Sequence, residues 1–268
     1  MIDAHVHLWQ LGRNGCTWPT SELAPIYRDF SPEDLRKVIS SSGTNEVILV
    51  QSQEDEADTS WLLSIADHPM IMGVVGWADL LAPGAVAAIS ELALDPRLLG
   101  LRPMVQDREA DWYDQSKLDE PLSAMATFDL VLDGLVRPKH LPSLTRLALR
   151  HPELAIIIDH GAKPQLADLD YWSEEIGSIA RLPNVYCKLS GLLTELPRGD
   201  EASLALICQR LWNAFGAERL VWGSDWPVLN LAASYQDWLG HCRRLVPPAD
   251  HDAVFALNAR RFYGPKSS

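Results

Sequence analysis

The sequence lacks the features of several large classes of protein. Its four cysteines, at positions 16, 187, 208 and 242, form no Cys-X-X-Cys pair, which is typical of reduced thiols in a cytoplasm. No apolar run approaches the ~20 residues that span a bilayer. The start of the chain has no basic segment followed by an apolar one, so we expect no signal peptide and predict a cytoplasmic protein.

Positive charge is also scarce. The 268 residues hold 23 Lys and Arg against 36 Asp and Glu, a formal net charge of -13. Nucleic acids and anionic membranes both attract basic surfaces, so we expect neither as a partner. There is no glycine-rich phosphate turn after a strand and no Gly-X-Ser-X-Gly segment, which argues against a nucleotide or other organic cofactor and against a serine hydrolase.

What the sequence does contain is a repeat of about thirty residues, in which a short apolar segment is followed by a helical pattern. Apolar segments of this continuous kind are typical of parallel strands buried on both faces. They fall at 2–7, 46–51, 71–77, 98–102, 130–136, 154–160, 184–190 and 219–225. Helical patterns fall at 31–43, 56–67, 83–94, 118–128, 141–150, 171–181, 201–215, 233–245 and 249–263. Eight such units predict a single (β/α)8 barrel over residues 1–268, with a doubly wound open sheet as the alternative.

The segment 11–30, between the first strand and the first helix, is long and rich in aromatic residues. In a barrel it would lie over the mouth as a loop or wall. Trp18 in this segment is therefore a candidate for contact with a substrate, although a tryptophan there can also simply pack in the wall.

The ends of the predicted strands carry an unusual number of polar side chains. The first strand ends in His5 and His7, which face the same side because they are two residues apart. The other candidates at or just after strand ends are Arg102, His160, Lys163, Lys188 and Asp225. Since the active site of such a barrel lies at the carboxyl ends of its strands, we expect these seven side chains to converge.

Each of these residues also has a purely structural interpretation. His160 and Asp225 could cap turns, Arg102 could pair with a loop acid such as Asp107, Lys163 could be exposed, and Lys188 could extend out of the seventh strand. Their convergence on one mouth is the reason for preferring the functional interpretation, because buried charges are costly unless they pair or bind something.

These positions resemble the amidohydrolase superfamily, whose members have His-X-His on strand one, His on strand six and Asp on strand eight of a (β/α)8 barrel. Further segments are similar to its "amidohydrolase 2" branch, and among these most similar to sugar-lactone hydrolases. They are 27–35 (YRDFSPEDL), 73–77 (GVVGW), 100–104 (GLRPM), 160–164 (HGAKP), 187–191 (CKLSG) and 223–227 (GSDWP).

The resemblance implies one divalent metal ion or none. Two-metal members place a bridging lysine or glutamate near the end of strand four or five, where this chain has Arg102 and Asp133. If Zn²⁺ is bound, His5, His7, His160 and Asp225 would be available as ligands. If no metal is required, the histidines would donate hydrogen bonds to the carbonyl or the water themselves.

The resulting hypothesis is hydrolysis of a sugar-acid lactone, such as L-fucono-, L-rhamnono- or L-galactono-lactone, with Asp225 as general base. Arg102, Lys163 and Lys188 would bind the substrate and stabilise the oxyanion. Three cations would also suit a pyrone dicarboxylate, so a hydrolase of that lactone is an alternative. A zinc-dependent decarboxylase and a barrel that only binds a sugar acid are the others. A homo-oligomer is left open.

Overall fold

The computed structural model describes residues 1–264, and its centre is one sheet of eight parallel strands paired in chain order. The strands are β1 (Ile2–Val6), β2 (Glu46–Val50), β3 (Ile71–Gly76), β4 (Leu98–Leu101), β5 (Val131–Gly134), β6 (Ile156–Ile158), β7 (Val185–Leu189) and β8 (Leu220–Trp222). The amide of His7 donates to the Trp226 carbonyl at 2.8 Å, and that of Asp225 donates to the His5 carbonyl at 2.9 Å. These bonds bring the segment after β8 against β1, and the predicted (β/α)8 barrel is confirmed.

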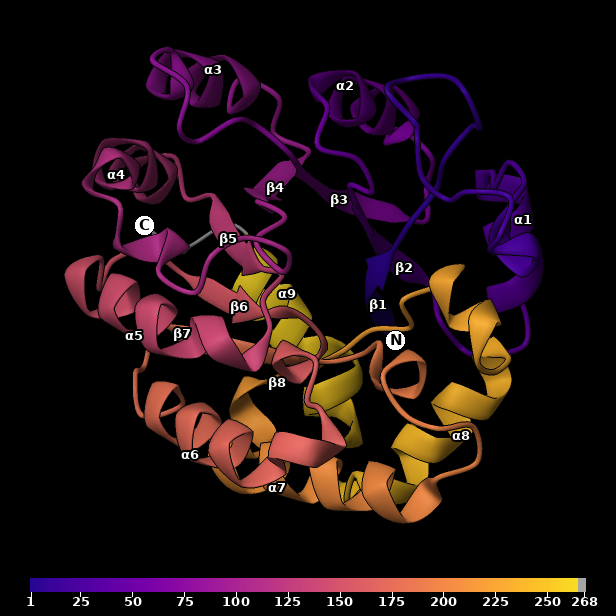
Figure 1. The fold of residues 1–268 in the computed structure, drawn as a ribbon. Coiled ribbons are helices and arrows are strands. Elements are labelled where there is room, and N and C mark those ends of the chain that lie inside the picture. Colours follow the sequence, from indigo (N-terminus) through magenta and orange to yellow (C-terminus); the bar gives the residue numbers. More distant parts are fainter. Residues whose placement is uncertain (265–268) are drawn as a thin grey trace.

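Helices surround the strands in chain order (Figure 1). They are α1 (Pro32–Ile39), α2 (Glu56–Ile65), α3 (Ala85–Leu92), α4 (Asp119–Thr127), α5 (Leu141–Arg150), α6 (Leu169–Ile179), α7 (Glu201–Arg219), α8 (Tyr235–Leu245) and α9 (Asn258–Tyr263). Most begin and end within a few residues of the predicted limits. The predicted last helix, 249–263, contains a π-helical turn over Ala253–Leu257 before α9. None of the helices among residues 1–264 has the length and apolarity that a membrane crossing requires.

The start of α1 shows how local sequence sets an element. The Ser31 side chain accepts from the Asp34 amide, the Asp34 carboxylate accepts from the Ser31 amide, and Pro32 occupies the first helical position. This capping box satisfies two amides that the helix itself leaves unpaired. It also places the end of the 11–30 segment directly against the barrel.

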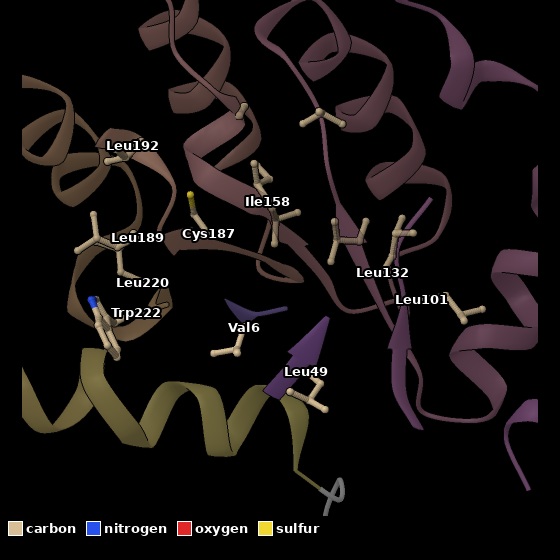
Figure 2. Packing of buried hydrophobic residues seen from close by; sticks show 14 of the residues in the cluster. Val6, Leu49, Leu101, Leu132, Ile158, Cys187, Leu189, Leu192, Leu220 and Trp222 are labelled. Carbon is tan, nitrogen blue, oxygen red and sulfur yellow. The ribbon is translucent and has the colours of Figure 1, made fainter. Parts of the chain in front are cut away.

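Alternate residues of each strand belong to two separate apolar layers. Val47 and Leu49 of β2 pack outward against the helices, whereas Ile48 and Val50 lie inside the barrel. Figure 2 shows part of the outer layer, to which β5 and β6 contribute Leu132 and Ile158, among others. This alternation determines which residues near the strand ends point into the barrel.

Helix α9 closes the barrel at the end opposite the site. Phe262 and Tyr263 pack with inward residues of the strands, among them Ile2, Val131 and Ile157, in one apolar cluster. In Figure 1, α9 is the yellow helix that crosses behind the strands. The interior is therefore filled from below, and any substrate site is confined to the carboxyl ends of the strands.

The segment 11–30 is held against the barrel by side chains at the end of β2. The Gln53 side-chain amide donates to the Trp18 carbonyl at 2.7 Å, and its Oε1 accepts from the Thr17 amide at 3.1 Å. Gln53 is itself positioned by Asp58 of α2, whose carboxylate accepts from the amides of Ser52 and Gln53.

Asp58 makes stability depend on pH. Burial raises the pKa of this carboxyl to about 6, although the two amides oppose the shift. A carboxyl whose pKa is higher in the folded chain binds more protons there, so its contribution to stability is complete below pH ~4 and is lost as the pH rises through 6. Relative to Asp58→Asn, which can still accept both amides, the wild type should lose about 3 kcal/mol of unfolding free energy between pH 4 and 7. Urea unfolding of both proteins across this range measures the difference, and a constant difference would contradict the assignment.

Candidate functional site

The carboxyl ends of the strands surround a cavity of about 620 Å³. Six of the eight site residues predicted from the sequence line it: His7, Trp18, Arg102, His160, Lys163 and Asp225. His5 and Lys188 lie beneath its wall with no exposed surface. The residues of the 11–30 segment in the lining are Gly15, Thr17 and Trp18, so this segment does form part of the mouth.

His5, His7 and Asp225 form a compact group. Nε2 of His5 lies 3.1 Å from Nε2 of His7, and Oδ1 of Asp225 lies 3.3 Å from Nε2 of His7 and 3.8 Å from that of His5. Both histidines come from β1 and the residue after it, and Asp225 comes from the segment that pairs with them. The closure of the barrel is therefore what assembles this group.

The other ring nitrogens are held by neighbouring groups. His7 donates from Nδ1 to the Val50 carbonyl at 2.8 Å, because a carbonyl oxygen can only accept. Neutral His7 therefore carries its lone pair on Nε2. Nδ1 of His160 contacts the Ser190 hydroxyl at 2.9 Å, which leaves its Nε2 as the nitrogen for a ligand. Such outer partners orient catalytic and metal-binding histidines.

Burial and charge set the protonation of this group. Burial lowers the pKa of His160 to about 4 and that of His5 well below its ordinary value, so both rings are neutral near pH 7. Burial alone would raise the pKa of Asp225, but the neighbouring His160, His7 and His5 hold it below its ordinary value. The site thus presents neutral imidazoles beside an ionised carboxylate.

Two of these residues have the left-handed backbone conformation, which is strained for residues other than glycine. His160 has φ +53° and Asp225 has φ +61°, a region that few non-glycine residues adopt. Lys163, three residues after His160, has φ +50°. Strain of this kind is concentrated at functional sites, where the surrounding structure maintains it.

A buried ionic cluster lies directly below the histidines. Nζ of Lys188 lies 2.5 Å from Oδ2 of Asp133, 3.0 Å from Oδ1 of Asp159 and 3.1 Å from Nδ1 of His5. The Tyr263 hydroxyl of α9 donates to the Asp133 carboxylate from below. Burial alone would raise the pKa of Asp159, but Lys188 and His5 hold it well below its ordinary value. The structure therefore places Lys188 among carboxylates rather than in the cavity wall where we expected it.

Sequence reasoning assigned no role to Asp159, and it noted Asp133 only as a residue near the position where two-metal members have a bridging lysine or glutamate. A signal for Asp159 was present, because it immediately precedes His160 at a strand end. For Asp133 the signal is its position along the strand, because residues two apart face the same side. Asp133 lies two residues after Val131, which points into the barrel. Neither pattern reveals that the two carboxylates share one lysine.

The two cations of the cavity wall are already paired. Arg102 contacts the Gln51 carbonyl through one Nη and lies 3.4 Å from Oδ2 of Asp159 through the other, while its buried Nε has no partner among the described residues. Lys163 lies 3.4 Å from the Glu195 carboxylate. Asp107, considered as a partner for Arg102, instead lies 3.8 Å from Arg137. Arg102 Nε is thus a buried donor without an acceptor among the described residues.

The donor set fits a single cation. Ligand atoms of His5, His160 and Asp225 lie within 4.8 Å of one another, and Nε2 of His7 adjoins them. Two imidazoles with a carboxylate match the ligands that Zn²⁺ prefers, on the condition that His5 offers a lone pair from Nε2. The second group of donors, His5, Asp133 and Asp159, is in contact with the Lys188 ammonium, which already supplies a positive charge there.

Comparison with known proteins places the chain in a family. A family model described as Amidohydrolase matches residues 2–264. The chain belongs to the amidohydrolase family. The resemblance inferred from the strand-end residues is therefore confirmed.

Two curated relatives and one solved structure are similar over nearly the whole length. An L-fucono-1,5-lactonase of Burkholderia ambifaria is 42% identical, with 98% of this chain and 94% of that protein covered. An L-fucono-1,5-lactonase of Burkholderia multivorans is 36% identical, with coverage of 98% and 95%. A crystal structure of a Burkholderia multivorans amidohydrolase with bound zinc is 31% identical, with a TM-score of 0.90 and 98% of each chain covered.

Gly191 provides a test of the His160 position. A Cβ at this residue would lie 2.3 Å from Nδ1 of His160, closer than any real contact, so Gly191→Ala must displace the ring. Gly199→Ala is a matched control, because Gly199 also has a positive φ but has open space around its Cβ position. We expect Gly191→Ala to lower kcat/KM by about 100-fold or more, since a displacement of ~1 Å has that effect. We expect Gly199→Ala to retain activity with a modest loss of stability. Equal kinetics in the two variants would show that His160 needs no fixed position.

Proposed function

We propose that the protein hydrolyses a sugar-acid lactone to the open acid, with L-fucono-1,5-lactone as the first substrate to test. The observation that carries this proposal is the 42% identity, over nearly the full length of both chains, to a protein named L-fucono-1,5-lactonase. The site geometry supports it, because a cavity with an ionised carboxylate, neutral imidazoles and an Arg guanidinium provides what ester hydrolysis requires.

The charge of the cavity favours a neutral substrate. Four carboxylates line it, those of Glu54, Asp55, Asp107 and Asp225, against the two cations Arg102 and Lys163. Each cation has an acidic partner nearby, Asp159 and Glu195, and two of the carboxylates have basic partners, Arg108 for Glu54 and Arg137 for Asp107. The lining residues themselves carry two more negative than positive charges, so a dianionic pyrone dicarboxylate would meet repulsion, whereas an uncharged lactone would not.

In the proposed reaction, a water bound to Asp225 Oδ1 beside His7 attacks the lactone carbonyl. Asp225 accepts the proton of that water, and the Arg102 guanidinium stabilises the developing oxyanion. The bond between the carbonyl carbon and the ring oxygen then breaks, and the proton passes to the ring oxygen to give a hydroxyl group. A zinc ion held by His160 and Asp225 with one histidine of the His-X-His segment would polarise the carbonyl and acidify the water when bound.

Removal of the Asp225 carboxylate tests this role. Asp225→Asn leaves a similar shape but no strong proton acceptor, so kcat should fall by roughly 100- to 10,000-fold. Asp107→Asn, which changes another carboxylate of the same cavity, should retain activity within a few-fold. Proton release from L-fucono-1,5-lactone, followed with a pH indicator, measures both. An Asp225→Asn enzyme with an unchanged rate would exclude Asp225 as general base.

A substrate panel tests the preference for neutral lactones. We expect turnover of L-fucono-, L-rhamnono- and L-galactono-lactones and none of 2-pyrone-4,6-dicarboxylate at equal concentration. Each assay is run before and after exhaustive chelation, and again with added zinc. The reverse preference would show that Arg102 and Lys163 bind anionic substrates in spite of their acidic partners.

A further inference from the structure

The Lys188 ammonium has three close partners. A lysine ammonium has three N–H donors and no acceptor. Nζ makes hydrogen bonds with Asp133 Oδ2 at 2.5 Å and His5 Nδ1 at 3.1 Å, and it forms an ion pair with Asp159 Oδ1 at 3.0 Å. Lys188 has no exposed surface, so no solvent competes for these donors. One N–H is available for each acceptor.

This arrangement determines which nitrogen of His5 carries the proton. If the ammonium donates to Nδ1, neutral His5 must be protonated on Nε2. The opposite tautomer would direct an N–H of His5 at the ammonium, two donors 3.1 Å apart. Asp159 Oδ1 lies 3.4 Å from His5 Nδ1, but it is closer to Lys188.

The hydrogen bonds that follow His5 agree with this tautomer. The Nε2 proton of His5 is directed at Nε2 of His7, 3.1 Å away. That atom holds the lone pair of His7, because His7 Nδ1 donates to the Val50 carbonyl. From Lys188 through His5 and His7 to Val50, every donor meets an acceptor.

We propose that Lys188 is a positioning residue: its ammonium occupies the place of a second cation, fixes His5 as the Nε2–H tautomer and withholds His5 from any metal ion at the mouth. It acts through His5 and does not contact the substrate. The consequence is a site whose first two histidines form a directed hydrogen-bond chain, in which the lone pair on Nε2 of His7 accepts from His5. The proposal concerns the arrangement of the site and does not depend on the identity of the lactone.

The tautomer can be measured directly. Nitrogen NMR of uniformly ¹⁵N-labelled, chelator-treated enzyme distinguishes protonated from unprotonated ring nitrogens, and His5→Gln identifies the His5 signals by their loss. We expect His5 to show a protonated Nε2 and an unprotonated Nδ1. The reverse assignment in the wild type would overturn the proposal.

Zinc affinity gives an independent test. In Lys188→Met the His5 lone pair is freed and two carboxylates lose their cation, so we expect zinc to bind roughly 10- to 100-fold more tightly, measured by competition with a chromogenic chelator. Lys188→Met with Asp133→Asn removes one charge of each sign and serves if the single variant does not fold. It should also bind zinc more tightly than the wild type.

Lys163→Met is the matched control, because it removes a positive charge from the cavity wall without any contact to His5. If it tightens zinc binding as much as Lys188→Met, the gain is due to charge alone and the proposal fails. An unchanged zinc affinity in both Lys188 variants would also overturn it.

Discussion

The pairing of Lys188 with Asp133 and Asp159 inside the barrel is the interaction on which the rest of the site depends. Lys188 lies on β7, Asp133 on β5 and Asp159 directly after β6, and all three side chains have no exposed surface. Charges buried in this way are tolerated only when their partners are complete, and removal of one partner typically costs 3–5 kcal/mol. The cluster therefore sets the relative positions of β5, β6 and β7 at the depth where the histidines begin.

The site can be described as three levels along the barrel axis. The lowest is the apolar cluster closed by α9, the middle is the ionic cluster, and the uppermost is the group of His5, His7, His160 and Asp225. Tyr263 joins the lowest level to the middle one, because its ring packs among apolar residues while its hydroxyl donates to Asp133. The positions of the side chains at the mouth thus depend on Tyr263, which lies near the end of the sequence.

Much of this arrangement could be predicted from sequence. The recurrence of apolar segments indicates the barrel, and the spacing of His5 and His7 shows that they share a face, because these patterns are properties of single strands. The depth at which a side chain lies in the barrel could not be predicted from such patterns. Lys188 lies on a strand that ends at the mouth, yet its ammonium contacts the carboxylates of Asp133, on β5 two strands away, and of Asp159, just after the adjacent β6. That depends on the register between strands. The need for glycine at 191 depends likewise on the approach of the His160 ring.

The closure of the barrel by α9 has a consequence for turnover. Because the interior is filled below the site, the product must leave by the mouth through which the substrate enters. In the proposed reaction, ring opening converts an uncharged molecule into an anion beside Asp225, in a cavity where carboxylates outnumber cations two to one. The charges that would admit a neutral ring would therefore repel the acid that it becomes, and this repulsion would clear the single route for the next substrate.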